Sequence, residues 1–148
     1  MRLAPAGLQI RWTPIPAVGV EAFDAQHLEL FCRAERLVHA LRGGGCHEVD
    51  PLLHSFLDYV TSHLACEEQW MTEAEYPGLK PHRDAHWRFG DQLQELERAY
   101  RRQGPTPPVA LAVRGWLTGW MTQHIASADA TLGRWLTDRD LLRSWRPR

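Results

Sequence analysis

Histidine and carboxylate side chains lie within otherwise apolar helical faces of this sequence. In the stretch YVTSHLACEEQWM, His63 and Glu67 share the face formed by Val60 and Leu64. Side chains four residues apart on a helix are close enough to reach one point. A buried carboxylate without a partner is costly, and a bound cation would remove that cost. This pair therefore favours a metal site.

The same arrangement recurs in other apolar segments. His82 and His86 lead into an apolar face that begins at Phe89, while His27 and His124 lie four residues from aromatic side chains on their own segments. One histidine on an apolar face is usually a hydrogen-bonded core residue. Five histidines and a carboxylate spread over four helices instead favour a metal centre, and this ligand set suits zinc, manganese or iron.

The three remaining histidines do not join this set. His39 and His54 fall off the apolar faces of their segments, and His47 lies in a glycine-rich stretch. We expect all three to be exposed to solvent.

Four amphipathic helices are needed to position these residues. The apolar periodicity predicts the first over residues 20–41 and the second from Pro51, with Asp50 as its N-cap; the third begins near Pro81 and the fourth near Pro108. No strand pattern is present. We therefore predict an all-α fold, an up-down-up-down antiparallel four-helix bundle with an irregular N-terminal arm. The predicted divisions are an arm (1–19), the bundle (20–136) and a short polar C-terminal tail (137–148).

Composition limits the class of protein. The chain has 148 residues and a net charge of −1, so it is sized for one domain and has no basic surface for nucleic acid. It has no secretory signal and no apolar run of about 20 residues, so we expect no membrane insertion. Its three cysteines form no CxxC pair. We expect a reduced, cytoplasmic protein and a monomer.

Four motifs together are typical of one family. The sequence contains a tryptophan and a glycine before D-x-Q-H, then H-x-x-x-E-E-x-x-M, then YP before H-x-x-x-H, and finally W-x-x-x-H-I-x-x-x-D. These motifs stand at Trp12, Gly19, Asp24 to His27; His63, Glu67, Glu68 and Met71; Tyr76, Pro77, His82 and His86; and Trp120, His124, Ile125 and Asp129. Across residues 12–136 the chain resembles the hemerythrins, most closely the single-domain bacterial ones.

The resemblance implies a cofactor of two non-haem iron ions bridged by an oxo or hydroxo group. It assigns His82, His86 and His124 to one iron, His27 and His63 to the other, and Glu67 and Asp129 to both as bridges. Asp129 rests on the resemblance alone, because five residues after His124 is about 140° around an α-helix. Glu68, next to Glu67, points away from the apolar face, and we expect it at the surface.

The implied ligand count leaves one position open, on the iron held by His27 and His63. In the family this position binds dioxygen. Apolar neighbours should keep the pocket dry, and the expected oxygen pocket consists of Leu30, Leu64, Trp120 and Ile125. Leu64 stands where the family usually has phenylalanine.

Reversible dioxygen binding for carriage, storage or delivery is the expected function, without enzymatic activity or catalytic residues, and with an oxygen-receiving protein as a partner. One alternative is a di-iron oxidase or an enzyme that handles peroxide or nitric oxide. The chain nevertheless lacks the Glu-x-x-His motif of ferritin-like oxidases. Another alternative is an oxygen sensor that acts through a separate partner.

Overall fold

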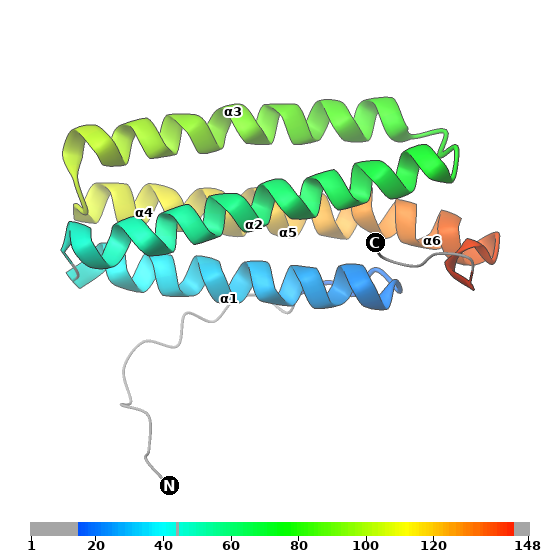
Figure 1. The fold of residues 1–148 in the computed structure, drawn as a ribbon, viewed down its shortest axis with the longest axis horizontal. Coiled ribbons are helices and arrows are strands. Elements are labelled where there is room, and N and C mark those ends of the chain that lie inside the picture. The colour runs from blue at the N-terminus through cyan, green and yellow to red at the C-terminus, as the bar shows by residue number, and fades with distance from the viewer. Residues whose placement is uncertain (1–14, 44, 144–148) are drawn as a thin grey trace, which may run out of the picture.

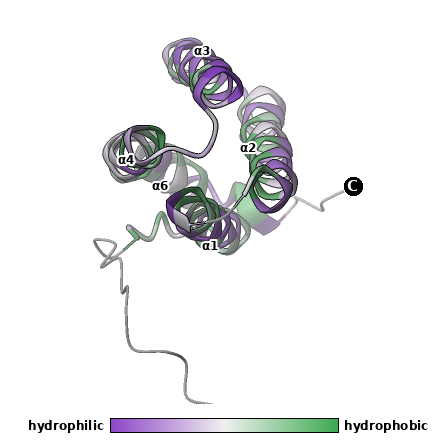
Figure 2. Cartoon of the chain, turned by 90° about the vertical axis from the view of Figure 1, so that its left-hand side faces the viewer, coloured by the Kyte–Doolittle hydropathy of each residue, from purple (hydrophilic) through white to green (hydrophobic). Residues whose placement is uncertain are grey.

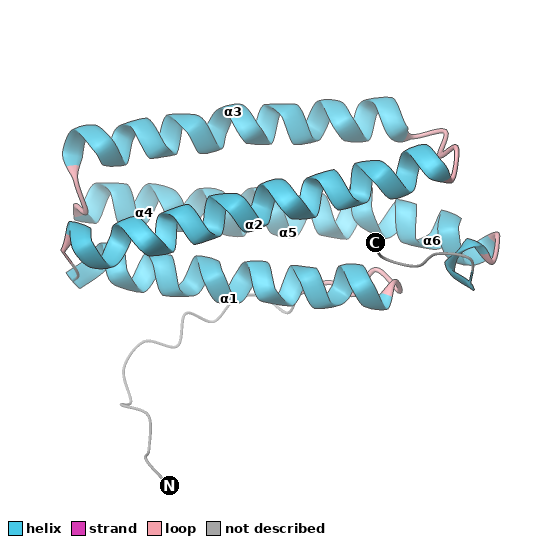
Figure 3. Cartoon of the chain, viewed as in Figure 1, coloured by secondary structure: helices cyan, strands magenta, loops and turns pink. Residues whose placement is uncertain are grey.

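Antiparallel helices form the body of the molecule. The computed structural model describes residues 15–43 and 45–143, and within these ranges every regular element is helical (Figure 3). The prediction of an all-α four-helix bundle is thus confirmed. Its elements are α1 (Glu21–Gly43), α2 (Cys46–Glu73), α3 (Leu79–Gln103), α4 (Pro107–Trp116), η1 (Leu117–Met121), α5 (Thr122–His124), η2 (Ile125–Asp129), α6 (Ala130–Asp138) and η3 (Leu141–Arg143).

Consecutive long helices run in opposite directions and are joined by short loops (Figure 1). In the view along the bundle, α1, α2, α3 and α4 occupy its four corners, so that each long helix has two neighbours (Figure 2). The segments α4, η1, α5, η2 and α6 follow one another without a break and make the fourth side. Trp12, most of the predicted arm and the last part of the predicted tail lie outside the described residues.

The second helix begins earlier than the sequence predicts. It starts at Cys46, so that Pro51 lies inside its second turn. The added turn places Val49, which is fully buried, in the core. Asp50 does not cap the helix and instead accepts a hydrogen bond of 2.7 Å from the hydroxyl of Tyr100. Burial of Val49 and this contact with α3 together account for the earlier start.

Apolar side chains from all four sides fill the interior. Among the largest fully buried ones are Phe23 from α1, Phe56 and Met71 from α2, Phe89 from α3 and Leu117 from η1. Burial of each such side chain stabilises the fold by about 1.5–3 kcal/mol relative to exposure. Because the packed helices cannot shift independently, this core fixes the positions of the polar residues on the same faces.

The segment before α1 is tied to the bundle at two points. The backbone N–H of Val18 donates a hydrogen bond of 2.8 Å to Oδ1 of Asp24. The carbonyl oxygen of Val18 lies so close to Gly133 that a Cβ atom at this position would be 2.1 Å from it. Gly133 therefore permits a close approach between this segment and α6. Asp24, the first residue of the D-x-Q-H motif, holds the approaching segment in place.

No helix in the described part of the chain is both long enough and apolar enough to cross a membrane.

Candidate metal centre

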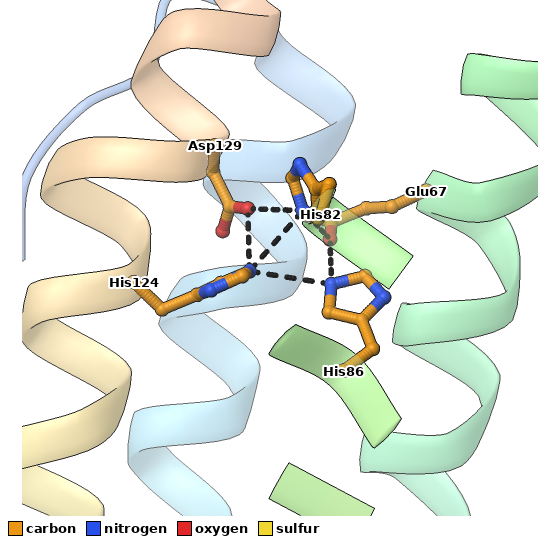
Figure 4. A group of neighbouring side chains, drawn as sticks. All are labelled: Glu67, His82, His86, His124 and Asp129. Carbon is orange, nitrogen blue, oxygen red and sulfur yellow. Dashed lines mark hydrogen bonds and ion pairs between the residues drawn. The ribbon is translucent and has the colours of Figure 1, made fainter. Parts of the chain in front are cut away.

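Seven polar side chains converge in the middle of the bundle. Each is at most 7% exposed, and they come from α1, α2, α3, α5 and η2. They are the predicted ligands His27, His63, Glu67, His82, His86, His124 and Asp129. Figure 4 shows five of them pointing toward a common centre. The amphipathic faces read from the sequence thus bring together histidines as far apart in the chain as His27 and His124.

Three histidines form one half of the cluster. Nε2 of His124 lies 3.2 Å from Nε2 of His82 and 3.2 Å from Nε2 of His86. Two carboxylate oxygens complete this half: Oε2 of Glu67 is 3.2 Å from Nε2 of His86, and Oδ1 of Asp129 is 3.0 Å from Nε2 of His124. Five potential ligand atoms therefore surround one point.

Two histidines form the other half. Nε2 of His63 lies 3.1 Å from Oε1 of Glu67. Nε2 of His27 lies 3.5 Å from the same oxygen and 3.2 Å from Oδ2 of Asp129. This half has four potential ligand atoms, one fewer than the half built on His82, His86 and His124.

Glu67 and Asp129 belong to both halves. Each carboxylate directs one oxygen toward the pair of histidines and the other toward the set of three. Among the described residues, the groups that could hold a metal ion are these two, and they share both carboxylates. A carboxylate divided in this way is arranged to bridge two cations.

A π-helical turn brings Asp129 to the site. The α-helical angle would place Asp129 about 140° from His124. In the structure, Ile125–Asp129 is π-helical, with i→i+5 hydrogen bonding in place of i→i+4. The wider turn returns Asp129 to the face of His124. Regular helical spacing could not have identified this residue, and π-helical turns frequently occur at functional sites.

The buried carboxylates lack ordinary hydrogen bonds. All four oxygens of Glu67 and Asp129 are inaccessible and have no hydrogen-bond partner among the described residues. Burial would raise the pKa of Glu67, but His63, His27 and His82 together hold it well below its usual value. Burial and Glu67 likewise act to raise the pKa of Asp129, and the surrounding histidines reverse this and lower it. Both groups are therefore ionised and need positive charge nearby.

The same two carboxylates raise the pKa of two histidines. Burial by itself lowers the pKa of His27, but Asp129 and Glu67 outweigh it and raise the pKa to about 9. Burial also lowers the pKa of His82, but Asp129 and Glu67 outweigh it and raise this pKa to about 9. Without a metal, protons on these rings balance the carboxylate charge. A bound cation would take over that role.

Side chains behind the cluster orient two of the rings. Oε1 of Gln26 lies 2.7 Å from Nδ1 of His63, and the amide of Gln26 donates a 3.7 Å hydrogen bond to Sγ of Cys66. Oε1 of Glu68 lies 3.0 Å from Nδ1 of His86. A partner on Nδ1 fixes the ring so that Nε2 faces the metal.

The expectation that Glu68 is a simple surface residue is therefore wrong. Its side chain is 27% exposed and contacts both His86 and Nε of Arg83, at 3.0 and 3.2 Å. Helical periodicity missed Glu68 and Gln26 because both lie at the edge of their apolar faces, where they contact a neighbouring helix. Their positions next to Glu67 and His27 within the two motifs were the available signal.

A small apolar cavity adjoins the half that has fewer ligands. His27 and His63 line it, together with all four residues expected for the oxygen pocket: Leu30, Leu64, Trp120 and Ile125. The volume available to the centre of a water-sized sphere is ≈ 10 Å³, about enough for one small molecule.

Trp120 lines this cavity next to His124. Its ring stacks on His124 with a centroid distance of 4.4 Å and an angle of 12°, and on Phe89 at 3.6 Å and 18°. Contacts on both faces hold the indole in one orientation and restrict the ring of His124.

The three histidines expected to be exposed to solvent, His39, His47 and His54, are exposed. Cys32, Cys46 and Cys66 are free thiols, with Cys46 exposed and the other two half-buried.

The donor set fits a pair of divalent or trivalent cations. Imidazole nitrogen and carboxylate oxygen are ligands that iron, manganese and zinc accept, and the buried, ionised oxygens of Glu67 and Asp129 without hydrogen bonds favour cations there. The fold and the cluster together define a metal-binding four-helix bundle.

Comparison with known proteins specifies the family. The family model described as the hemerythrin HHE cation binding domain matches residues 18–136. The chain belongs to the hemerythrin family, whose members bind dioxygen at non-haem iron.

Individual relatives agree with this assignment. A bacteriohemerythrin of Ralstonia nicotianae is 30% identical over 88% of this chain and 90% of its own length. A myohemerythrin of Sipunculus nudus is 27% identical over 52% of this chain and 57% of its own length. A solved crystal structure of a leucine-to-phenylalanine mutant has the same fold, with a TM-score of 0.70 and 23% identity over 85% of this chain and 95% of that one.

Proposed function

We propose that this chain binds dioxygen reversibly at a pair of iron ions, as an oxygen carrier, storage or delivery protein. The observation that supports this most strongly is the unequal division of ligands around two shared carboxylates. Both histidines of the half with four ligand atoms line the apolar cavity, whereas of the three histidines in the half with five only His124 does.

In this proposal each side chain has a definite role. His82, His86 and His124 would hold one ion, His27 and His63 would hold the other, and Glu67 and Asp129 would bridge them. An oxo or hydroxo group would be the remaining bridge. When bound, the ferrous pair would supply the two electrons that dioxygen takes up and would recover them when it leaves. The half built on His27 and His63 offers one ligand atom fewer, so an ion held there would have a position free for this ligand.

The protein's own contribution is to exclude water and hold the ligands still. Leu30 and Ile125 are at most 4% exposed and present only hydrocarbon to the cavity. A dry pocket disfavours proton delivery, which would convert a reversible reaction into irreversible oxidation of the metal. Gln26 and Glu68 keep His63 and His86 oriented during repeated cycles.

The size of the cavity favours a binding protein over an oxidase. A volume of ≈ 10 Å³ leaves no room beside the cluster for an organic substrate. We propose that the chain is not an enzyme. An enzyme that handles peroxide or nitric oxide would fit the same cavity, and reversibility of oxygen binding distinguishes the two functions. Delivery to an oxygen-receiving protein, or a sensing role through a separate partner, would use the same reversible step.

Cycles of oxygenation test the proposal. Reduced, iron-loaded protein should change its visible absorption in air and recover the original spectrum under vacuum over several cycles. A His63→Ala variant, which lacks one ligand on the half with the free position, should lose this response. Consumption of dioxygen that vacuum does not return would contradict reversible binding and favour the oxidase alternative.

A further inference from the structure

An open groove runs along the outside of the bundle between α2 and α3. It is lined from α2 by residues that include Ala65 and from α3 by residues that include Trp87, Gly90 and Leu93. Its volume is ≈ 410 Å³ by the measure used for the inner cavity. Trp87, at its edge, is 72% exposed. The groove is thus a solvent-accessible depression close to the metal cluster.

The groove and the inner cavity share two lining residues. Val60 and Leu64 of α2 line both spaces. Val60 is 1% exposed, whereas Leu64 is half-buried and so reaches from the inner cavity toward the groove. At this position a single layer of side chains separates solvent from the space beside His27 and His63.

The α3 side of this boundary is unusually open. Phe89 lines the inner cavity, and the next residue, Gly90, lines the groove. A Cβ atom at Gly90 would have no other atom within 4 Å. No side chain from this position therefore supports Leu64 from outside.

The other walls of the inner cavity are more firmly closed. Leu30, Met121 and Ile125 are at most 4% exposed. Trp120 is half-buried, but its ring is stacked between Phe89 and His124 and cannot swing without breaking both contacts. The boundary at Leu64 is the wall that a side-chain rotation alone would open.

We propose that dioxygen reaches the inner cavity from the groove between α2 and α3, and that rotation of Leu64 past Gly90 sets the rate. This inference rests on the proposed function for the identity of the ligand. Side-chain rotamer changes take picoseconds to nanoseconds when the side chain is not tightly packed. A leucine with open space on one side would therefore admit a small apolar molecule while blocking bulk water most of the time.

Zinc-loaded protein separates access from oxygen chemistry. Zinc has no redox chemistry, so dioxygen acts only as a collisional quencher of tryptophan emission. Trp120 lines the inner cavity and serves as the reporter. Its emission is obtained as the difference between each protein and the same protein carrying Trp120→Phe. All proteins carry Trp87→Phe, which removes the exposed indole of the groove.

A Gly90→Phe variant adds a ring at a residue that lines the groove and does not line the inner cavity. Gly90→Phe should lower the rate constant for quenching of Trp120 roughly threefold or more. Leu64→Ala should raise the same rate constant. A tenfold change in this constant corresponds to about 1.4 kcal/mol in the barrier. The matched control is Gly115→Phe, at an exposed glycine of α4 that also has open space around it. Equal quenching in the Gly90 and Gly115 variants would overturn the proposed route.

Iron-loaded protein gives a second readout. Gly90→Phe should slow oxygen association and dissociation by the same factor and leave the dissociation constant unchanged, because it alters the path and not the bound state. A change in affinity with unaltered rates of approach would contradict the route. Absence of reversible binding in the unsubstituted protein would instead refute the proposed function, and the zinc experiment would still decide the route.

Discussion

Nδ1 of His86 lies 3.0 Å from Oε1 of Glu68, on the opposite side of the ring from the Nε2 atom that faces Glu67. Such a carboxylate–histidine contact fixes the tautomer and raises the basicity of the ligand nitrogen. Glu68 is in turn held by Nε of Arg83 at 3.2 Å. Two adjacent glutamates on α2 therefore act on the same histidine from its two nitrogens.

Loss of this contact should weaken metal binding. We predict that Glu68→Ala lowers metal affinity by about 10- to 100-fold, as removal of comparable partners does. Glu68→Gln should lose less, because its carbonyl oxygen still accepts from Nδ1 of His86. Competition with a chelator measures the affinity. The control is Glu73→Ala, which removes an exposed glutamate bonded only to Gln69 among the described contacts; equal losses in the two alanine variants would refute the role of Glu68.

A second prediction concerns the contact between Gly133 and Val18. Gly133→Ala would place a methyl group 2.1 Å from a backbone oxygen, so the segment before α1 has to move. We expect a loss of about 1–3 kcal/mol in the free energy of unfolding. Gly115→Ala, in open space on α4, should instead stabilise the protein by up to about 1 kcal/mol. Denaturant unfolding of both variants checks the signs, and a stabilising Gly133→Ala would show that the close approach is not maintained in solution.

A third prediction concerns pH. In metal-free protein the pKa of His27 and of His82 is raised from 6.5 to about 9. Their stabilising effect is complete below pH 6.5 and is lost as pH rises toward 9, a loss on the order of 3 kcal/mol for one such group. The lowered pKa values of Glu67 and Asp129 act in the opposite sense, because their contribution is lost as pH falls below about 4.

Thermal unfolding across pH tests this balance. Metal-free protein should be most stable between about pH 4 and 6.5 and should lose stability from pH 6.5 to 9. Zinc-loaded protein should change little over the latter range, because its ligand imidazoles are already neutral. Metal uptake near pH 7.5 should also release protons to an indicator dye. A metal-free protein that became more stable above pH 6.5 would contradict the charge balance described for the cluster.

Much of this arrangement could be predicted from the sequence, because burial follows helical periodicity. His27, His63 and His86 are in step with neighbouring apolar residues, so the same pattern that predicts the helices also predicts that these rings face inward. The four-helix architecture followed from the same periodicity and from the short breaks between the segments.

The rest depended on departures from regular geometry. Asp129 reaches the site through a π-helical turn, which no α-helical angle anticipates. Pro51 was expected to begin α2, yet burial of Val49 extends the helix to Cys46. Glu68 acts across to α3, and such a contact depends on how two helices are placed side by side. Sequence periodicity describes one helix at a time and therefore cannot supply it.

Anomalous diffraction at the iron edge, from crystals of the iron-loaded protein, tests the central claim most directly. Two iron peaks per chain are expected, one beside His82, His86 and His124 and the other beside His27 and His63, with Glu67 and Asp129 contacting both. A single peak, or two peaks that do not share these carboxylates, would contradict it.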